Sequence, residues 1–117
     1  MPSVLGPGEG LTRADVPGLS ELTSPHGDYT LVLQPDGNLV LYNNRTRERL
    51  WSSGTGGQAV RTAIMQHDGN FVIYGFPDPI WATATPGHAG SFLAVQDDGS
   101  VVIYQPKAPL WTTKTSS

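Results

Sequence analysis

The sequence predicts an all-β protein of one domain. Its 14 glycines and 10 prolines are too many for long helices in a chain of 117 residues. An eleven-residue block that alternates apolar and polar residues occurs three times, and turn residues interrupt each copy. The length suits a single domain. We therefore expect residues 1–117 to form one unit of short strands and tight turns.

The opening segment, residues 1–21, carries only weak signals. Residues 11–22 contain Pro17 and Gly18 and do not sustain an apolar period of 3.6 residues, so no helix is expected there. We predict a short opening strand followed by a loop, with a strand starting again at Tyr29.

Three tandem repeats follow, covering approximately residues 22–55, 56–85 and 86–117. Their blocks read VLQPDGNLVLY, IMQHDGNFVIY and AVQDDGSVVIY. Each block is followed by a W-x-(S/T)-x-T segment, and the three evenly spaced tryptophans are Trp51, Trp81 and Trp111. The same residue types recur in register in every copy, which excludes a chance match and indicates a fold built from three similar units.

Each block has the signature of a β-hairpin. In the first, Pro35-Asp36-Gly37 suits a type I turn that is closed by a glycine in the left-handed conformation. A loop of odd length keeps side-chain parity across the turn. One face of the hairpin should therefore carry Val32, Gln34, Asn38, Val40 and Tyr42. The opposite face, which we expect to form the core, should carry Leu31, Leu33, Leu39 and Leu41.

The first of these faces carries the groups that bind hydroxyls. Gln34 and Asn38 supply amides that both donate and accept hydrogen bonds. Asp36 adds carboxylate acceptors, Tyr42 a phenol, and Val40 an apolar contact for the C–H face of a ring. No repeated histidine, serine nucleophile, lysine or second carboxylate accompanies them, so the set predicts binding of polyols without catalysis. The aspartate, glycine and valine also have a purely structural explanation, whereas glutamine and asparagine are not preferred strand residues and favour a ligand site.

Composition argues against several classes of partner. A net charge of -3, from 7 basic and 10 acidic side chains, offers no basic stripe for nucleic acid. The apolar runs are far shorter than the roughly 20 residues that span a bilayer, so no membrane insertion is expected. No signal peptide is visible, and we expect a soluble protein, cytoplasmic or secreted without a recognisable leader. The 3 histidines share no ligand spacing and there are 0 cysteines, so no metal, cofactor or disulfide is expected.

The block has the form Q-x-D-x-N-x-V-x-Y. Its tandem copies with their trailing W-x-(S/T)-x-T segments resemble the bulb-type, or snowdrop-type, mannose-binding lectins over roughly residues 22–117. Residues 8–11, Gly-Glu-Gly-Leu, resemble the opening strand of that family. The resemblance implies a β-prism II fold, in which three four-stranded antiparallel sheets surround a pseudo-threefold axis. It also implies a non-catalytic, multivalent lectin with one mannose site on each sheet.

In that family the glutamine, aspartate and asparagine bond the 2- and 3-hydroxyls of a sugar with an axial 2-hydroxyl, the tyrosine reaches the 4-hydroxyl, and the valine packs against ring carbons. Carried over by position, the expected carbohydrate-binding residues are Gln34, Asp36, Asn38, Val40, Tyr42, Gln66, Asp68, Asn70, Val72, Tyr74, Gln96, Asp98, Ser100, Val102 and Tyr104. Ser100 stands where the pattern has asparagine, and its lost amide donor should weaken the third site. The absent disulfide also departs from plant members and fits a relative from a bacterium, a fungus or an animal.

Two features admit two explanations each. The tryptophans could be platforms for sugar stacking, but they lie apart from the polar face in sequence, and we expect them to pack in the core about the pseudo-axis. Residues 43–49, where the first repeat is two residues longer than the others, contain three arginines. We expect a solvated hairpin tip there rather than a basic patch.

The resemblance also implies an assembly. Members of the family often form dimers by exchanging C-terminal strands, and Leu110 to Thr115 have a suitable strand pattern, so we expect a homodimer. The competing function is a protein-interaction or bacteriocin-type module on the same fold, with partly degenerate sugar sites. An enzyme fits less well, because glycoside hydrolysis needs two carboxylates about 5 to 9.5 Å apart. Only Asp97 neighbours a motif aspartate, Asp98, and adjacent turn residues should point in different directions.

Overall fold

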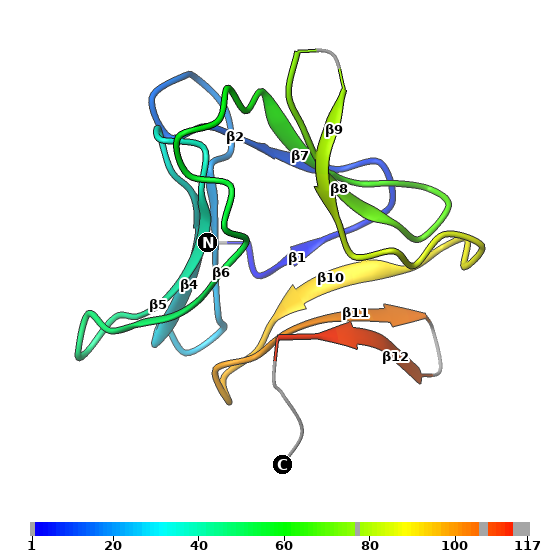
Figure 1. Ribbon diagram of the computed structural model, residues 1–117. Helices are drawn as coiled ribbons and strands as arrows, with labels where there is room; N and C mark the ends of the chain where they lie inside the picture. Colours follow the sequence, from blue (N-terminus) through cyan, green and yellow to red (C-terminus); the bar gives the residue numbers. More distant parts are fainter. Residues whose placement is uncertain (1, 77, 106–107, 114–117) are drawn as a thin grey trace.

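The computed structural model describes residues 2–76, 78–105 and 108–113, which form twelve strands and no helix. The strands lie in three four-stranded antiparallel sheets that surround a common interior (Figure 1). The all-β prediction and the arrangement of three sheets are thus confirmed. In the described part of the chain, no helix is long and apolar enough to cross a membrane.

Each sheet is an ordered set of neighbouring strands. The first has the order β1-β10-β11-β12, with bounds Val4–Leu5, Phe92–Val95, Val101–Gln105 and Ala108–Thr112. The second has the order β2-β7-β8-β9, with bounds Gly10–Thr12, Thr62–Met65, Phe71–Tyr74 and Pro79–Ala82. The third has the order β3-β4-β5-β6, with bounds Glu21–Thr23, Tyr29–Leu33, Leu39–Asn43 and Arg49–Ser52.

The N-terminal segment supplies the fourth strand of every sheet. Strand β1 pairs with β10, β2 with β7 and β3 with β4, so the first 23 residues visit all three sheets before the first hairpin begins. The sequence predicted one opening strand and missed β1 and β3. These strands have only 2 and 3 residues, too few for an alternating pattern, and the sheet edge against which they pair holds them extended.

The hairpins have the predicted register. Leu33 pairs with Leu39 across the first turn, and Met65 pairs with Phe71 and Val95 with Val101 in the other two. Because the loops contain an odd number of residues, the leucines of the first hairpin all face the interior. They are 0 to 1% exposed and belong to one apolar cluster: Leu31, Leu33, Leu39 and Leu41. The prediction of the core face is confirmed.

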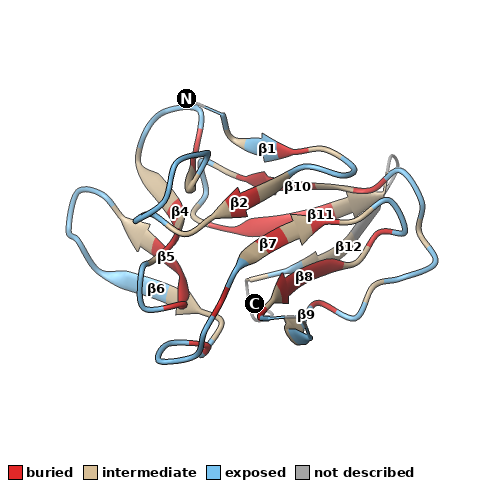
Figure 2. Ribbon diagram, turned by 90° about the horizontal axis from the view of Figure 1, so that it is seen from above, coloured by how far each residue is buried: buried red, intermediate tan, exposed pale blue. Residues whose placement is uncertain are grey.

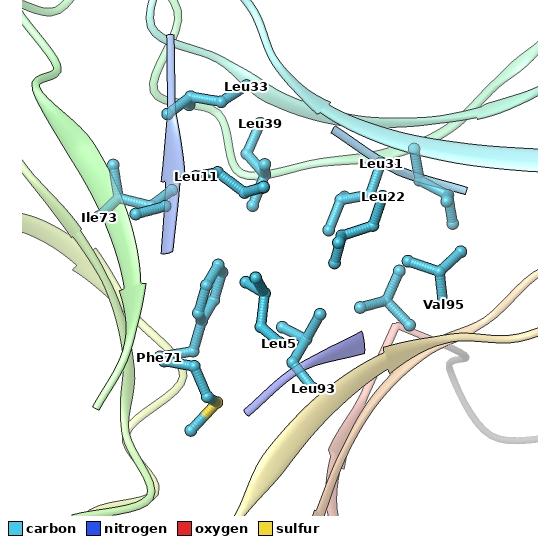
Figure 3. Packing of buried hydrophobic residues seen from close by; sticks show 14 of the residues in the cluster. Leu5, Leu11, Leu22, Leu31, Leu33, Leu39, Phe71, Ile73, Leu93 and Val95 are labelled. Atoms are coloured by element: carbon cyan, nitrogen blue, oxygen red, sulfur yellow. The ribbon is translucent and has the colours of Figure 1, made fainter. Parts of the chain in front are cut away.

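All three sheets and all three N-terminal strands contribute to this cluster. Each short strand inserts one leucine, namely Leu5, Leu11 and Leu22, and these point inward together with hairpin residues such as Phe71 and Leu93 (Figure 3). Burial of a leucine side chain contributes about 1.5 to 3 kcal/mol, which explains how strands this short stay docked. Buried residues follow the strands, while the connecting loops are largely exposed (Figure 2).

The three tryptophans form a closed triangle. The ring centroids of Trp51 and Trp81, Trp51 and Trp111, and Trp81 and Trp111 lie 5.6, 5.7 and 5.9 Å apart in edge-to-face geometry. All three are partly buried and pack against the apolar cluster. The prediction that they pack about the pseudo-axis is therefore confirmed, and a role as separate sugar platforms is not supported.

Candidate functional site

The first candidate site lies on the hairpin that joins β4 and β5. Gln34 follows β4, and its carbonyl accepts a hydrogen bond from Gly37 N at 3.0 Å, which closes the predicted turn. Gly37 has a φ of 93°, and a Cβ there would lie 2.5 Å from the carbonyl oxygen of Gln58, so this position requires glycine. Tyr42 lies farther along β5, where it pairs with Thr30. The turn and the strand together place the five predicted residues along one hairpin, and the Gln34–Tyr42 hydrogen bond joins the first of them to the last.

The glutamine and the tyrosine of each motif are joined. Gln34 Nε2 donates a hydrogen bond to Tyr42 Oη at 2.5 Å, and Gln96 Nε2 donates to Tyr104 Oη at the same distance, 2.5 Å. Gln66 and Tyr74 form the same bond. An amide nitrogen carries two hydrogens and a phenol one of its own. The pair therefore holds both side chains in place and keeps donors for a ligand.

The aspartate of each motif closes its own turn. Asp36 Oδ1 accepts a hydrogen bond from Asn38 N at 2.9 Å, and Asp68 Oδ1 accepts one from Asn70 N at 2.9 Å. This Asx turn fixes the carboxylate at the hairpin tip. Since a carboxylate has two oxygens, each of these aspartates offers a ligand a second oxygen in a fixed position.

The motif asparagine has a structural role that the sequence did not predict. Asn38 is only 8% exposed, and its Oδ1 accepts hydrogen bonds from Gly54 N at 3.1 Å and Thr55 N at 3.2 Å. Asn70 Oδ1 accepts likewise from Thr85 N at 3.2 Å. Because the oxygen of each amide is used in this way, its Nδ2 group is the part that can donate to a ligand.

The W-x-(S/T)-x-T segment forms a clasp over the turn. Thr55 Oγ1 donates to the carbonyl of Gly37 at 2.6 Å, and Thr85 Oγ1 donates to the carbonyl of Gly69 at 2.6 Å. The sequence contained a signal for this arrangement, because the threonine and the asparagine recur together in the first two repeats. In the first two repeats the clasp connects the tryptophan to the hairpin that carries the candidate site.

The third motif differs from the other two. Ser100 is 2% exposed, and its Oγ lies 3.0 Å from Gln96 Oε1 and 2.5 Å from Asp98 Oδ1. The serine thus bonds within its own motif, where asparagine bonds to the clasp. Phe92 stands opposite Tyr104, with ring centroids 5.6 Å apart, where the other sheets have threonine. Lys114 and Thr115, which end the third W-x-(S/T)-x-T segment, lie outside the described residues.

The motif valines are less accessible than expected. Val40 is 0% exposed, and Val72 and Val102 are 4% and 5% exposed. They lie on the strands between the other motif residues, so they form the floor of each site. A sugar can touch Val40 only where the side chains that cover it move apart.

The two neighbouring carboxylates of the third turn have different partners. Asp97 Oδ1 accepts a hydrogen bond from His26 N at 2.8 Å, whereas Asp98 Oδ1 accepts one from Ser100 N at 3.0 Å. Asp97 therefore connects two sheets instead of joining Asp98 in a catalytic pair. Among the described residues, no cluster of three or more histidines and carboxylates could hold a metal ion.

Comparison with known proteins gives partial and full-length similarities. No family model matches the chain. A mannose-specific lectin of Dendrobium findlayanum is 49% identical over 47 residues, which span 39% of this chain and 27% of that protein. One from Narcissus pseudonarcissus is 42% identical over 50 residues, which span 42% of this chain and 44% of that protein. The chain thus matches less than half the length of either curated relative.

Similarity to solved structures extends over the whole chain. A monomeric mannose-binding lectin from Gastrodia elata is 34% identical with a TM-score of 0.83, covering 98% of this chain and 99% of that one. The snowdrop (Galanthus nivalis) mannose-specific agglutinin is 34% identical with a TM-score of 0.73, covering 98% of each chain. A domain-swapped lectin dimer from Mycobacterium smegmatis is 43% identical with a TM-score of 0.55, covering 94% of this chain and 97% of that one.

Fold and comparison agree on the class of protein. Three antiparallel sheets, each with a motif hairpin as its two central strands, define a β-prism II lectin fold. The chain belongs to the bulb-type mannose-binding lectin family. The relatives named above are lectins, which bind carbohydrate without transforming it.

Proposed function

We propose that this protein is a non-catalytic lectin that binds mannose, or mannose-containing glycans, at its first and second hairpins. One observation carries the proposal: in both hairpins the glutamine, aspartate and asparagine are fixed by hydrogen bonds, yet each retains groups for a ligand. Mannose is proposed as the sugar because the relatives are named mannose-specific lectins or agglutinins. The proposed binding residues are Gln34, Asp36, Asn38, Val40 and Tyr42 in the first site and Gln66, Asp68, Asn70, Val72 and Tyr74 in the second.

Each polar group has a distinct proposed role. The free oxygen of Asp36 accepts from a sugar hydroxyl, and Asn38 Nδ2 donates to the same or the neighbouring hydroxyl. Tyr42 Oη already accepts from Gln34 and donates its own proton to a third hydroxyl. Two adjacent hydroxyls, one of them axial, suit donors and acceptors that converge on one hairpin tip. Preorganisation lowers the entropy cost of binding.

The third hairpin, with Gln96, Asp98, Ser100, Val102 and Tyr104, is proposed as the weakest site. A missing hydrogen bond costs about 0.5 to 1.5 kcal/mol, or roughly two- to twelvefold in affinity. The internal bonds of the Ser100 hydroxyl add to this loss, because a sugar must compete with them for Gln96 and Asp98.

Useful affinity is proposed to come from several sites acting together. A single shallow site binds at about millimolar strength, whereas linked sites gain a factor of about 10² to 10⁴. We propose that a homodimer with exchanged C-terminal strands links the sites. Its support is the 43% identity to the domain-swapped dimer from Mycobacterium smegmatis. The lectin from Gastrodia elata is monomeric, so the oligomeric state of this protein has to be measured.

Binding of methyl α-mannoside in titration calorimetry tests the function. The decisive variant carries Asp36→Asn and Asp68→Asn together, since asparagine keeps the oxygen that closes each turn and replaces the other with an amide. The wild-type protein should bind at millimolar strength or better, and the double variant should lose at least tenfold in affinity with an unchanged circular dichroism spectrum. Equal binding by both proteins, or no binding by either, would overturn the proposal.

A protein-interaction module is the second candidate, and the self-bonded third hairpin is the observation that favours it. The two candidates differ in a glycan array. A lectin binds mannose-containing glycans on the array, and the double variant does not. A protein-interaction module leaves the array blank.

A further inference from the structure

A cleft of about 410 Å³ lies where the second sheet meets the loops that connect it to the third. Its lining comes from the loop after β2, the segment that leads into β7 and the turn between β8 and β9, all in the upper part of Figure 1. The described residues that line it include none of the five proposed to bind mannose at the second hairpin. The cleft is therefore separate from the mannose sites. Its volume falls in the range of about 300 to 1,000 Å³ that is typical of ligand pockets.

Three side chains form the apolar part of this cleft. Val60 is 0% exposed and belongs to the core cluster, so it underlies the cleft. Val16 and Phe76 are 38% and 67% exposed and line the cleft from the surface. An apolar ligand in the cleft would cover both side chains and remove their apolar surface from water, which favours binding.

The charged part of the cleft is a guanidinium with no partner in the protein. Arg13 lines the cleft, but its Nε and Nη2 lie 3.1 and 3.2 Å from the two carboxylate oxygens of Asp15. Within the part of the chain that the structure describes, the exposed side chain of Arg61 has no hydrogen bond or ion pair. The described lining residues include no aspartate or glutamate. Two arginines against the one aspartate leave an excess positive charge at the cleft, although the net charge of the chain is -3.

Two hydroxyl groups also line the cleft, and both use their hydrogens within the protein. Thr12 and Thr62 are paired across β2 and β7. Thr62 Oγ1 donates to the carbonyl of Leu11 at 2.7 Å, and Thr12 Oγ1 donates to the carbonyl of Leu19 at 3.4 Å. A hydroxyl has one hydrogen to donate. Recognition of an anion in this cleft therefore depends on Arg61.

The cleft beside the first hairpin has a different composition. Its described lining residues are all polar or charged: Glu21, Thr30, Tyr42, Asn43, Asn44 and Arg47. A carboxylate accompanies the guanidinium there, and no aliphatic side chain or phenylalanine is among these residues. Apolar walls combined with an unpaired positive charge therefore distinguish the cleft of the second sheet from that of the third.

We propose that the cleft of the second sheet is a separate ligand site, which binds a small apolar carboxylic acid. The carboxylate pairs with the Arg61 guanidinium, whose donors form a fork that matches two carboxylate oxygens. The apolar body packs against Val16 and Phe76 above Val60. A neutral apolar molecule leaves the guanidinium without a partner, and an acid without an apolar body leaves Phe76 in water. This ligand binds independently of mannose.

The test uses 3-phenylpropionate, titrated into the ¹⁵N-labelled full chain and followed through its amide resonances by NMR. Three analogues separate the two halves of this probe. Of these, 3-phenylpropan-1-ol keeps the ring without the charge, propionate keeps the charge without the ring, and 3-phenylpropylamine reverses the charge. The cleft variants are Arg61→Gln and Phe76→Ala. Their matched controls are Arg49→Gln and Leu50→Ala, which change an exposed arginine and a 41% exposed leucine that do not line the cleft.

The probe should bind at about millimolar strength or better, shift the amide resonances of Arg61, Thr62 and Phe76, and bind about tenfold more tightly than each analogue. Arg61→Gln should abolish the preference for the acid over the alcohol. Phe76→Ala should weaken binding of the acid about two- to twelvefold, and both controls should bind it as the wild type does.

Three results would overturn the proposal: no binding of 3-phenylpropionate, resonance shifts confined to other parts of the chain, or a preference for the acid that survives Arg61→Gln. Equal binding of the acid and the alcohol would also overturn it, and would indicate an apolar surface for another protein instead. Saturating methyl α-mannoside and the Asp36→Asn, Asp68→Asn double variant should leave binding of the acid unchanged. Competition by the mannoside would place the acid at a hairpin and refute the separate site. Because the titration of the acid involves no sugar, its outcome is independent of whether the protein binds mannose.

Discussion

At the scale of single residues, the motif asparagine has two functions on one side chain. Its oxygen holds the clasp through Gly54 and Thr55, and its nitrogen is left to donate to a sugar. Serine cannot do both, because its single hydroxyl has one hydrogen and a shorter reach. In the third hairpin that hydroxyl lies within bonding distance of Gln96 and Asp98. The serine therefore removes an amide donor, and its one hydroxyl hydrogen competes with a sugar for Gln96 Oε1 or Asp98 Oδ1.

The Ser100→Asn substitution should strengthen the third site. Asparagine restores the amide donor and releases Gln96 Oε1 and Asp98 Oδ1 from their contact with the serine hydroxyl. Calorimetry with methyl α-mannoside should show one more binding site per chain, or a gain of about two- to twelvefold at the weakest site. The reciprocal control, Asn38→Ser, should weaken the first site. An unchanged stoichiometry and affinity for Ser100→Asn would show that another residue, such as Phe92, limits the third hairpin.

At the scale of the element, the clasp and the hairpin act as one unit. Thr55 is 2% exposed, and its hydroxyl joins the segment after β6 to the carbonyl of Gly37 in the β4–β5 turn. Ser53 Oγ adds a second link, because it accepts from Leu39 N at 3.1 Å. The edge strand β6 is therefore tied to the turn that carries Asp36, and stability and site geometry depend on the same bonds.

The Thr55→Val substitution should destabilise the protein by about 1 to 3 kcal/mol. Valine has nearly the same shape, so the main change is a buried carbonyl of Gly37 that loses its donor. Urea unfolding followed by tryptophan fluorescence measures the change. Thr46→Val is the control, because Thr46 lies on an exposed loop, and it should shift the free energy of unfolding by about 0.5 kcal/mol or less. A Thr55→Val protein as stable as the control would mean that the clasp contributes little.

The sequence predicted the structure best where a residue pattern repeats. It predicted least where residues far apart in the chain come into contact. The alternation within the eleven-residue block predicted each hairpin and its core face, because an odd loop length fixes which side chains share a face across the turn. Strands β1 and β3 are too short for such a pattern. A cleft lined by Glu21 and Arg47 was not predicted either, since the two residues come to line it only when β3 pairs with β4.

At the scale of the whole molecule, the tryptophan triangle connects the three sheets. Each ring lies edge-to-face with the other two, with centroids 5.6 to 5.9 Å apart. Edge-to-face pairs contribute about 0.5 to 1.5 kcal/mol beyond the burial of their area. Removal of one ring should thus lower the stability of all three sheets and not only that of the sheet that carries it.

The Trp81→Ala substitution should cost about 3 to 5 kcal/mol, a large part of the 5 to 15 kcal/mol that stabilises a typical domain. Urea unfolding followed by circular dichroism and by tryptophan fluorescence should give one coincident transition at lower urea. Phe76→Ala is the control: Phe76 is 67% exposed, and its loss should cost about 0.5 kcal/mol or less. Separate transitions for the two probes would contradict a shared core.

The proposed strand exchange places a constraint on this triangle. Trp111 lies on β12 and contacts both other tryptophans, and β12 pairs with β11 in the same chain. An exchanged dimer must therefore complete each triangle with Trp111 from the other chain, in the same position. The fold within each half of such a dimer would be the one described above. Only the chain connection would differ.

An engineered disulfide between β11 and β12 can distinguish the two connections. Val102 and Thr112 are paired across these strands, and paired strand residues have Cα atoms about 4.5 to 5.5 Å apart, within the range for a disulfide. The chain has 0 cysteines of its own, so Val102→Cys with Thr112→Cys creates one possible bond in each β11–β12 pair. In an exchanged dimer that bond joins two chains, and a non-reducing denaturing gel should show a dimer band. Sedimentation equilibrium of the unmodified protein at micromolar concentration should give the dimer mass. A monomer band would refute the exchange, whatever the sedimented mass.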